Sequence, residues 1–126
     1  MHADSHIYES DRIEPVPLNL RRKYILKSKD NSKKLIRIAP FLRNFVNFRR
    51  LNFMDDDYSI DEPMNIIFCR HVIIYFDKPT QERLLKKLCQ NLHPGGFLFL
   101  GHSESLSGLD VPLVQVASTI YRKPCL

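Results

Sequence analysis

Apolar and polar residues form two different patterns along the chain, and the pattern changes near residue 50. Before that point, residues 23–26 and 35–38 are short apolar runs separated by a polar, lysine-rich segment. Two such runs around a turn-forming cluster predict a β-hairpin. Residues 45–48 are a candidate third strand, and residues 18–24 could form one or two helical turns. So small and charged a sheet is typical of a subdomain attached to a larger domain.

After residue 50 the pattern is that of an α/β protein. Residues 65–69 form a continuous apolar run, which is typical of a strand covered on both faces. Pro79 suits the first turn of a helix that ends at residues 93–96, and residues 97–100 form a second buried strand. One face of this helix carries Leu84, Leu85, Leu88 and Leu92, and Glu82 and Lys86 form a pair on the other side. Strand, helix and strand together predict a right-handed, parallel βαβ unit.

The end of the chain adds a short hairpin at the edge of this sheet. Its two runs are residues 113–116 and 119–122, and Pro124 prevents further pairing. The chain is therefore expected to have three parts. These are a lead-in segment (1–22), an antiparallel β-subdomain (23–49) and an α/β part (50–126).

Composition narrows the class of protein. The chain has 126 residues, of which 44% are hydrophobic, which fits one small globular domain or a piece of a larger one. A net charge of +5 favours an acidic partner, which could be nucleic acid, an anionic membrane or a protein surface. No apolar run approaches the roughly 18 residues that span a bilayer, so no membrane insertion is expected.

The cysteines and histidines point to neither disulfides nor a metal. The three cysteines, Cys69, Cys89 and Cys125, are odd in number and far apart. They predict reduced thiols in a cytoplasmic protein. The five histidines do not combine with them at metal-ligand spacing, and no metal site is predicted.

Polar residues follow both predicted parallel strands directly. Arg70 and His71 end the first, and residues 101–104 (GHSE) end the second. Ligands of open parallel sheets bind outside the carboxyl ends of the strands, so these clusters should lie side by side at a functional edge. From the residues alone, Arg70 could also be a surface ion-pair residue and His71 a strand cap. Ser103 lacks a nucleophile elbow and is not expected to be a nucleophile.

Three segments in register resemble the CheR methyltransferases. Residues 66–77 (IIFCRHVIIYFD) resemble the F-C-R-N-V-x-I-Y-F-D signature of that family. Residues 92–105 (LHPGGFLFLGHSES) resemble its L-x-P-G-G-x-L-x-L-G-H-S-E-S motif, and residues 48–53 (FRRLNF) resemble its F-x-x-x-N-L segment. The resemblance extends from about residue 7 to residue 123.

The resemblance implies a fold and an activity. Residues 50–126 would be the C-terminal half of a Rossmann-like, S-adenosylmethionine-dependent methyltransferase sheet, and residues 23–49 its small inserted antiparallel β-subdomain. Members of the family methylate glutamate side chains on the cytoplasmic helical bundle of chemoreceptors. The chain has four glycines and no glycine-rich cofactor loop. We therefore interpret it as a truncated form that is inactive alone.

Two other functions are alternatives to this one. The chain could be a non-catalytic receptor-binding module derived from such an enzyme. It could also belong to a methyltransferase that acts on nucleic acid, but it lacks the basic stripe interleaved with aromatic residues that single-strand binders use. A nucleic-acid partner is therefore not expected.

The resemblance also implies site residues. Asn52 and Phe53 would contact the adenosine part of S-adenosylmethionine, and Arg70 and His71 would form the next cofactor-contacting pair. Tyr75 would place an aromatic hydroxyl near the methyl donor, so Arg70 and Tyr75 are the candidate catalytic residues. Tyr75 as a core aromatic is the open alternative. The chain departs from the family at His71, where Asn is usual, and at Phe53, where Leu is usual.

The lysine-rich loop bears on the partner. Some members of the family hold a C-terminal pentapeptide of the receptor at the β-subdomain, next to a glycine-rich hairpin loop. Here the matching loop, residues 28–34, has no glycine. We expect no pentapeptide binding, and instead a contact with the acidic helical bundle of the receptor through Lys27, Lys29, Lys33 and Lys34. A merely solvated loop is the alternative.

Overall fold

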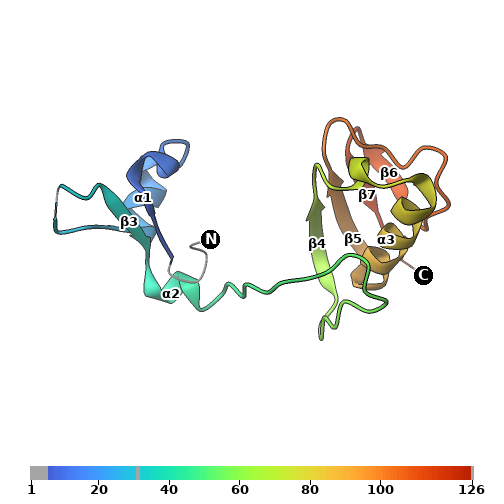
Figure 1. Cartoon of the computed structure of the whole chain (residues 1–126), viewed down its shortest axis with the longest axis horizontal. Helices are drawn as coiled ribbons and strands as arrows, with labels where there is room; N and C mark the ends of the chain where they lie inside the picture. The colour runs from blue at the N-terminus through green and yellow to red at the C-terminus, as the bar shows by residue number, and fades with distance from the viewer. Residues whose placement is uncertain (1–5, 31, 126) are drawn as a thin grey trace. The chain divides into compact units, whose positions relative to one another are not determined.

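The chain divides into two compact units, one that ends at Arg50 and one that begins at Leu51. The structure is a computed structural model, and it describes residues 6–30 and 32–125. Figure 1 shows the first unit in blue to green and the second in green to red. The division falls one residue from the boundary expected between residues 49 and 50.

The first unit contains a three-stranded antiparallel sheet in the order β1-β3-β2. Its strands are β1 (Ile7–Glu9), β2 (Ile25–Lys27) and β3 (Leu35–Ile38). Its short helices are η1 (Ser10–Ile13), α1 (Leu18–Tyr24) and α2 (Pro40–Arg43). The predicted hairpin is confirmed, because β2 and β3 pair antiparallel. Ile36 on the central strand is buried.

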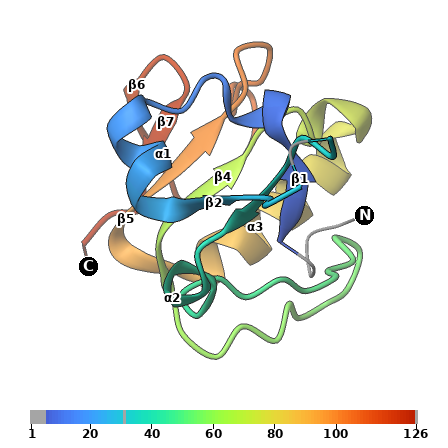
Figure 2. The ribbon, with the colours of Figure 1, turned by 90° about the vertical axis from the view of Figure 1, so that its left-hand side faces the viewer.

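The third strand of this sheet was predicted in the wrong place. Residues 45–48 belong to no strand, and Phe45 is 84% exposed. The third strand is β1, which pairs with β3 and lies in the segment expected to be a lead-in. Figure 2 shows β1, β2 and β3 together. Pro40 starts a helix directly after β3, which ends the extended chain there. The edge of β3 that does not pair with β2 pairs with β1 instead.

The second unit contains a four-stranded mixed sheet in the order β4-β5-β7-β6. Its strands are β4 (Met64–Cys69), β5 (Leu92–Leu100), β6 (Val114–Ala117) and β7 (Ile120–Arg122). Its helices are η2 (Ile73–Tyr75) and α3 (Lys78–Gln90). β4 and β5 are parallel and flank α3 in sequence, so the predicted parallel βαβ arrangement is confirmed. β6 and β7 form the predicted hairpin, with β6 at the edge of the sheet.

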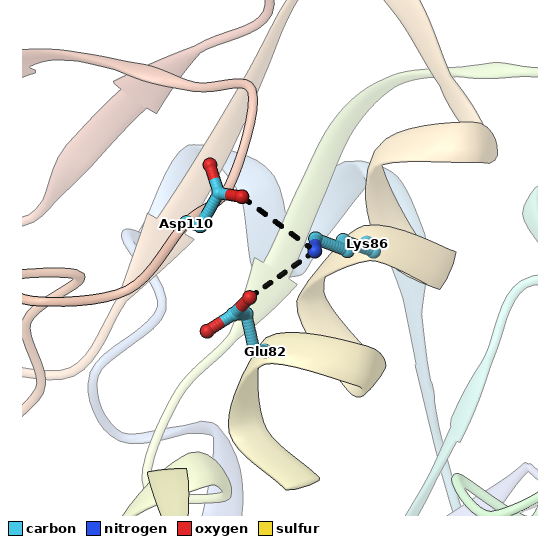
Figure 3. Close-up of polar contacts among 3 residues, drawn as sticks. All are labelled: Glu82, Lys86 and Asp110. Atoms are coloured by element: carbon cyan, nitrogen blue, oxygen red, sulfur yellow. Dashed lines mark hydrogen bonds and ion pairs between the residues drawn. The ribbon is translucent and has the colours of Figure 1, made fainter. Parts of the chain in front are cut away.

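Local sequence features explain why helix α3 forms where it does. The carboxylate of Asp77 accepts a hydrogen bond from the Thr80 N–H at 3.0 Å and caps the first turn. Leu84 and Leu85 are fully buried in the core. On the exposed side, Lys86 forms the predicted pair with Glu82 at 3.1 Å and reaches Asp110 at 4.0 Å, as Figure 3 shows. The helix ends at Gln90, before the predicted stop, because β5 already begins at Leu92.

The sheet of the second unit is covered on one face by the described residues. The core cluster joins leucines of α3 to Cys69 of β4 and Leu98 of β5. On the other face, Ile66 is 51% exposed and Phe68 is 69% exposed. The expectation that β4 is covered on both faces is therefore wrong for the described residues. A continuous apolar run shows that both faces of a strand can be buried, not what lies over them.

The core of the second unit leads to the first prediction. We expect Leu85→Ala to lower the free energy of unfolding by about 2–5 kcal/mol, because it leaves a cavity in a packed interior. Leu85 is 0% exposed. Urea denaturation followed by circular dichroism measures the change. Arg83→Ala, at an exposed position on the same helix, is the control and should shift stability by no more than about 0.5 kcal/mol.

Candidate functional site

The two predicted polar clusters meet at one edge of the sheet. Because β4 and β5 are parallel, their carboxyl ends lie at the same edge. The His71 N–H donates to Oε2 of Glu104 at 2.9 Å, which joins the segment after β4 to the segment after β5. Gly101 packs closely against both, since a Cβ there would stand 3.0 Å from Glu104 Oε2 and 3.2 Å from His71 Cε1. The predicted proximity of the two clusters is confirmed.

Glu104 is the most constrained polar residue at this edge. Its side chain is buried, and residue 104 is 4% exposed. Oε1 accepts from the N–H groups of Val72 at 2.8 Å and Ile73 at 2.9 Å. Oε2 accepts from His71 at 2.9 Å and Gly101 at 2.8 Å. One carboxylate therefore satisfies four backbone donors from two segments that are about thirty residues apart.

The charge of Glu104 is stabilised by these donors. Burial raises the pKa of its carboxyl group, but the N–H groups of Gly101, His71 and Val72 together lower the pKa below its ordinary value. Hydrogen bonds to a charged group favour that charged form. Glu104 is therefore ionised near neutral pH. The sequence pattern puts Glu104 in the polar cluster and indicates no role for it, because a glutamate in a polar segment carries no sign of its burial.

His71 has a left-handed backbone, with φ of 58°. Few residues other than glycine adopt this conformation, and Asn, Asp and His are enriched among those that do. His71 therefore adopts a backbone conformation that is also open to Asn, the residue usual at this position of the CheR signature. Its side chain is exposed at the edge of the sheet. The departure from Asn changes the chemistry of the side chain at this position and keeps a residue type that tolerates the turn.

Arg70 and Tyr75 flank the segment that Glu104 holds. Both are exposed, and Tyr75 is 79% exposed, so the alternative that it is a core aromatic is wrong. Tyr75 ends η2. The side chain of Gln81 on α3 donates to the carbonyls of Ile73 at 2.7 Å and Phe76 at 3.0 Å, which fastens this turn to the helix. An exposed cation and an exposed phenol thus stand on a rigidly held segment.

Asn52 and Phe53 lie in a loop that is fastened to α3. Lys87 on α3 donates to the carbonyl of Phe53 at 2.9 Å, and the Tyr58 hydroxyl donates to the same oxygen at 3.0 Å. Oδ1 of Asn52 accepts from the Met54 N–H at 3.0 Å. Phe53 packs against the same core cluster as the segment after β4. These contacts anchor the loop to α3 and to the core of the second unit.

Other chemistries have less support. Burial raises the pKa of Cys69 and of Cys89 to about 11, so both thiols stay protonated at neutral pH and are poor nucleophiles. His102 and Ser103 are both exposed. Within residues 6–30 and 32–125, no group of three or more His, Cys, Asp or Glu side chains could hold a metal ion. In the same ranges, no helix has the length and apolarity to cross a bilayer.

An α/β unit with a polar site at the ends of parallel strands is the class that the geometry defines, and comparison with known proteins gives the family. Residues 1–122 match the family described as CheR methyltransferase, SAM binding domain. Chemotaxis protein methyltransferase 2 of Pseudomonas aeruginosa is 37% identical over 119 residues. The chemotaxis protein methyltransferases of Klebsiella aerogenes and Escherichia coli are 38% and 34% identical over 120 and 119 residues. The chain belongs to the CheR methyltransferase family.

The extent of these matches differs between the chain and its relatives. Each of the three covers 94% of this chain, but the chain spans only 41–42% of the relatives' own length. The methyl donor of this family's domain is S-adenosylmethionine. The residues present are compatible with that molecule, because an exposed cation such as Arg70 could bind its carboxylate and a half-buried ring such as Phe53 could contact its adenine.

The buried carboxylate leads to the second prediction. At pH 7 we expect Glu104→Gln to lower the free energy of unfolding by about 1.5–3 kcal/mol, because an amide cannot accept from all four N–H groups and carries no charge. The pKa of Glu104 is lower in the folded state than its ordinary value of 4.5. Its stabilisation is therefore present above about pH 4.5 and is lost as the pH falls through the lower folded-state pKa.

The measurement is urea denaturation from pH 7 down to pH 3.5. The difference between wild type and Glu104→Gln should shrink as the pH falls below 4.5, the ordinary pKa. Glu62→Gln makes the same charge change at an exposed position before β4 and serves as the control. A constant difference across the whole range would contradict a charged Glu104.

Proposed function

We propose that these residues serve S-adenosylmethionine-dependent methyl transfer to glutamate side chains of chemoreceptors, the adaptation reaction of chemotaxis, in the cytoplasm. Family membership and the names of the relatives support the proposal. The observation that carries it is the exposed Arg70-His71 pair held at the ends of two parallel strands by Glu104. Because the chain spans about two fifths of its relatives, the activity of a whole protein is part of the proposal.

The chemistry asks little of the protein beyond alignment. S-adenosylmethionine supplies a methyl group on a positively charged sulfur, an electrophile that leaves its bonding electron pair on sulfur. The receptor glutamate is already ionised near neutral pH, so no proton has to be removed before its oxygen attacks. In the proposal, Arg70 orients a carboxylate by charge-assisted hydrogen bonds and the exposed Tyr75 forms part of the pocket wall. Alignment of two reactants can lower a barrier by several kcal/mol.

We also propose that these 126 residues do not catalyse the reaction by themselves. Within residues 6–30 and 32–125, β4 is an edge strand of its sheet, and Ile66 and Phe68 on one of its faces are exposed. The candidate cofactor residues Asn52, Arg70 and His71 are all exposed to solvent. A site that excludes water needs walls on several sides. The second possibility is a non-catalytic receptor-binding module. It would use the same basic surface, but a longer protein that contains it would transfer no methyl group.

The third prediction tests this function in a chimera. The matching part of the Escherichia coli relative would be replaced by this chain, and transfer of labelled methyl groups to a receptor cytoplasmic fragment would be measured. We expect transfer by the chimera and none by the 126 residues alone. Arg70→Ala should lower kcat/KM by about ten- to hundredfold through loss of a charge-assisted bond, and Tyr75→Phe by less.

The controls of this experiment separate the two candidate functions. Arg83→Ala removes an exposed arginine from α3 and should leave kcat/KM unchanged. Unaltered kinetics in both Arg70→Ala and Tyr75→Phe would show that these residues are misplaced. A chimera that binds the receptor fragment and transfers no methyl group would favour the binding module.

The basic loop between β2 and β3 supports a proposal about the partner. We propose that the first unit is the inserted antiparallel β-subdomain and that it meets the acidic helical bundle of the receptor through this loop. Lys27, Lys29, Lys33 and Lys34 are all exposed. The loop is ordered by Asp30, whose carboxylate accepts from Ser32 N at 3.0 Å and Oγ at 2.6 Å. Asn31 of this loop lies outside the described residues.

The fourth prediction concerns this loop. In a titration with a receptor cytoplasmic fragment at low salt, Lys29→Ala/Lys33→Ala should weaken binding by roughly two- to thirtyfold, because exposed ion pairs contribute little each. Arg12→Ala/Arg22→Ala removes two exposed charges from the same unit and should have a smaller effect. High salt should weaken wild-type binding. A tethering pentapeptide should not bind, and salt-insensitive, micromolar binding of the pentapeptide would contradict the proposal. If neither the receptor fragment nor the pentapeptide binds, the loop is merely solvated.

A further inference from the structure

We propose that Glu104 is a positioning residue of the methyl-transfer site, which sets where the side chains of Arg70 and His71 project. The inference rests on the proposed function, because it takes this pair to contact the cofactor. Glu104 itself is buried and cannot touch a ligand from its place beneath the two segments. It acts through the backbone that it holds.

The position of the four donors carries the argument. Three of them are consecutive, at His71, Val72 and Ile73, and follow Arg70 directly. Three consecutive N–H groups that converge on one carboxylate fix the path of the chain where it leaves β4. The same carboxylate holds Gly101 at 2.8 Å, so the path is fixed relative to the end of β5. Arg70 thus projects from a segment tied to both strands.

The four hydrogen bonds to Glu104, here called the Glu104 clamp, also hold the backbone conformation of His71. Its left-handed conformation, with φ of 58°, is unfavourable for most residues and persists where surrounding contacts over-determine it. The hydrogen bond from His71 N to Glu104 is such a contact. Gly101 packs beside it without a side chain, 3.2 Å from His71 at the place of a Cβ. Loss of the carboxylate would leave donors unsatisfied and release the turn.

The clamp also reaches the second candidate catalytic residue. Ile73, whose N–H lies 2.9 Å from Glu104 Oε1, is the first residue of η2, and Tyr75 is the last. Gln81 holds the carbonyl of Ile73 from the side of α3 at 2.7 Å. Arg70 and Tyr75 therefore stand at the two ends of one segment with a fixed backbone. A shift of about 1 Å in such a segment can cost roughly a hundredfold in rate.

The test is the kinetics of Glu104→Gln and Glu104→Asp in the chimera that carries the full chain. Gln has the same shape as Glu but presents an amide NH₂ to backbone N–H groups, and Asp keeps the charge on a shorter side chain. For Glu104→Gln we expect the KM for S-adenosylmethionine to rise by about ten- to hundredfold, with the KM for the receptor fragment within about twofold. Glu104→Asp should be intermediate. Glu62→Gln is the matched control at an exposed site.

The split between the two KM values separates positioning from stability. A merely structural role would reduce the folded fraction, which lowers the apparent kcat and leaves the KM for S-adenosylmethionine unchanged; that result overturns the inference. Equal losses in Glu104→Gln and Glu62→Gln would overturn it too. A wild-type chimera without methyl transfer overturns the proposed function and this inference with it, whereas an active wild type with an unaltered Glu104→Gln overturns the inference alone.

Discussion

The convergence of four backbone N–H groups on the carboxylate of Glu104 is the interaction on which the candidate site depends. Removing a carboxylate from water is costly unless hydrogen bonds replace its hydration. Here both oxygens have two donors each, so the backbone compensates the buried charge. Each of the four N–H groups in turn gains a hydrogen-bond acceptor. The two segments after β4 and β5 are therefore coupled by one side chain that the fold cannot replace with an apolar residue.

Helix α3 provides the support on which this clamp rests. Its buried leucines fix the helix to the covered face of the sheet. Its polar side chains then reach the two segments that carry the candidate residues: Lys87 holds the carbonyl of Phe53, and Gln81 holds those of Ile73 and Phe76. Such side-chain bonds to carbonyls satisfy loop backbone that makes no strand pairs. One helix thus links core packing to the positions of residues in both loops, while Ile66 and Phe68 on the opposite face of β4 are exposed among the described residues.

Most of the elements could be predicted from the sequence because their signals are local. The bounds of β3 and α1, the start of α3 near Pro79 and the tail hairpin follow from short patterns of apolar residues, prolines and turn formers. The third strand was missed because β1 has three residues and depends on pairing with β3, which is distant in sequence. The open face of β4 and the burial of Glu104 were missed for the same reason. The sequence pattern shows whether a residue can be buried, and the tertiary structure decides whether it is buried and which residues it contacts.

Position 71 shows how backbone and side-chain constraints divide at such a site. The backbone there is left-handed and is held by Glu104 and by the close approach of Gly101. These contacts involve the N–H of His71 and the space around its Cα, so they restrict the residue to types that tolerate this conformation. Asn and His both do. The exposed side chain is then free to differ in its chemistry, and an imidazole ring replaces an amide. At position 71 the backbone conformation therefore limits the residue types, while the exposed side chain sets the chemistry.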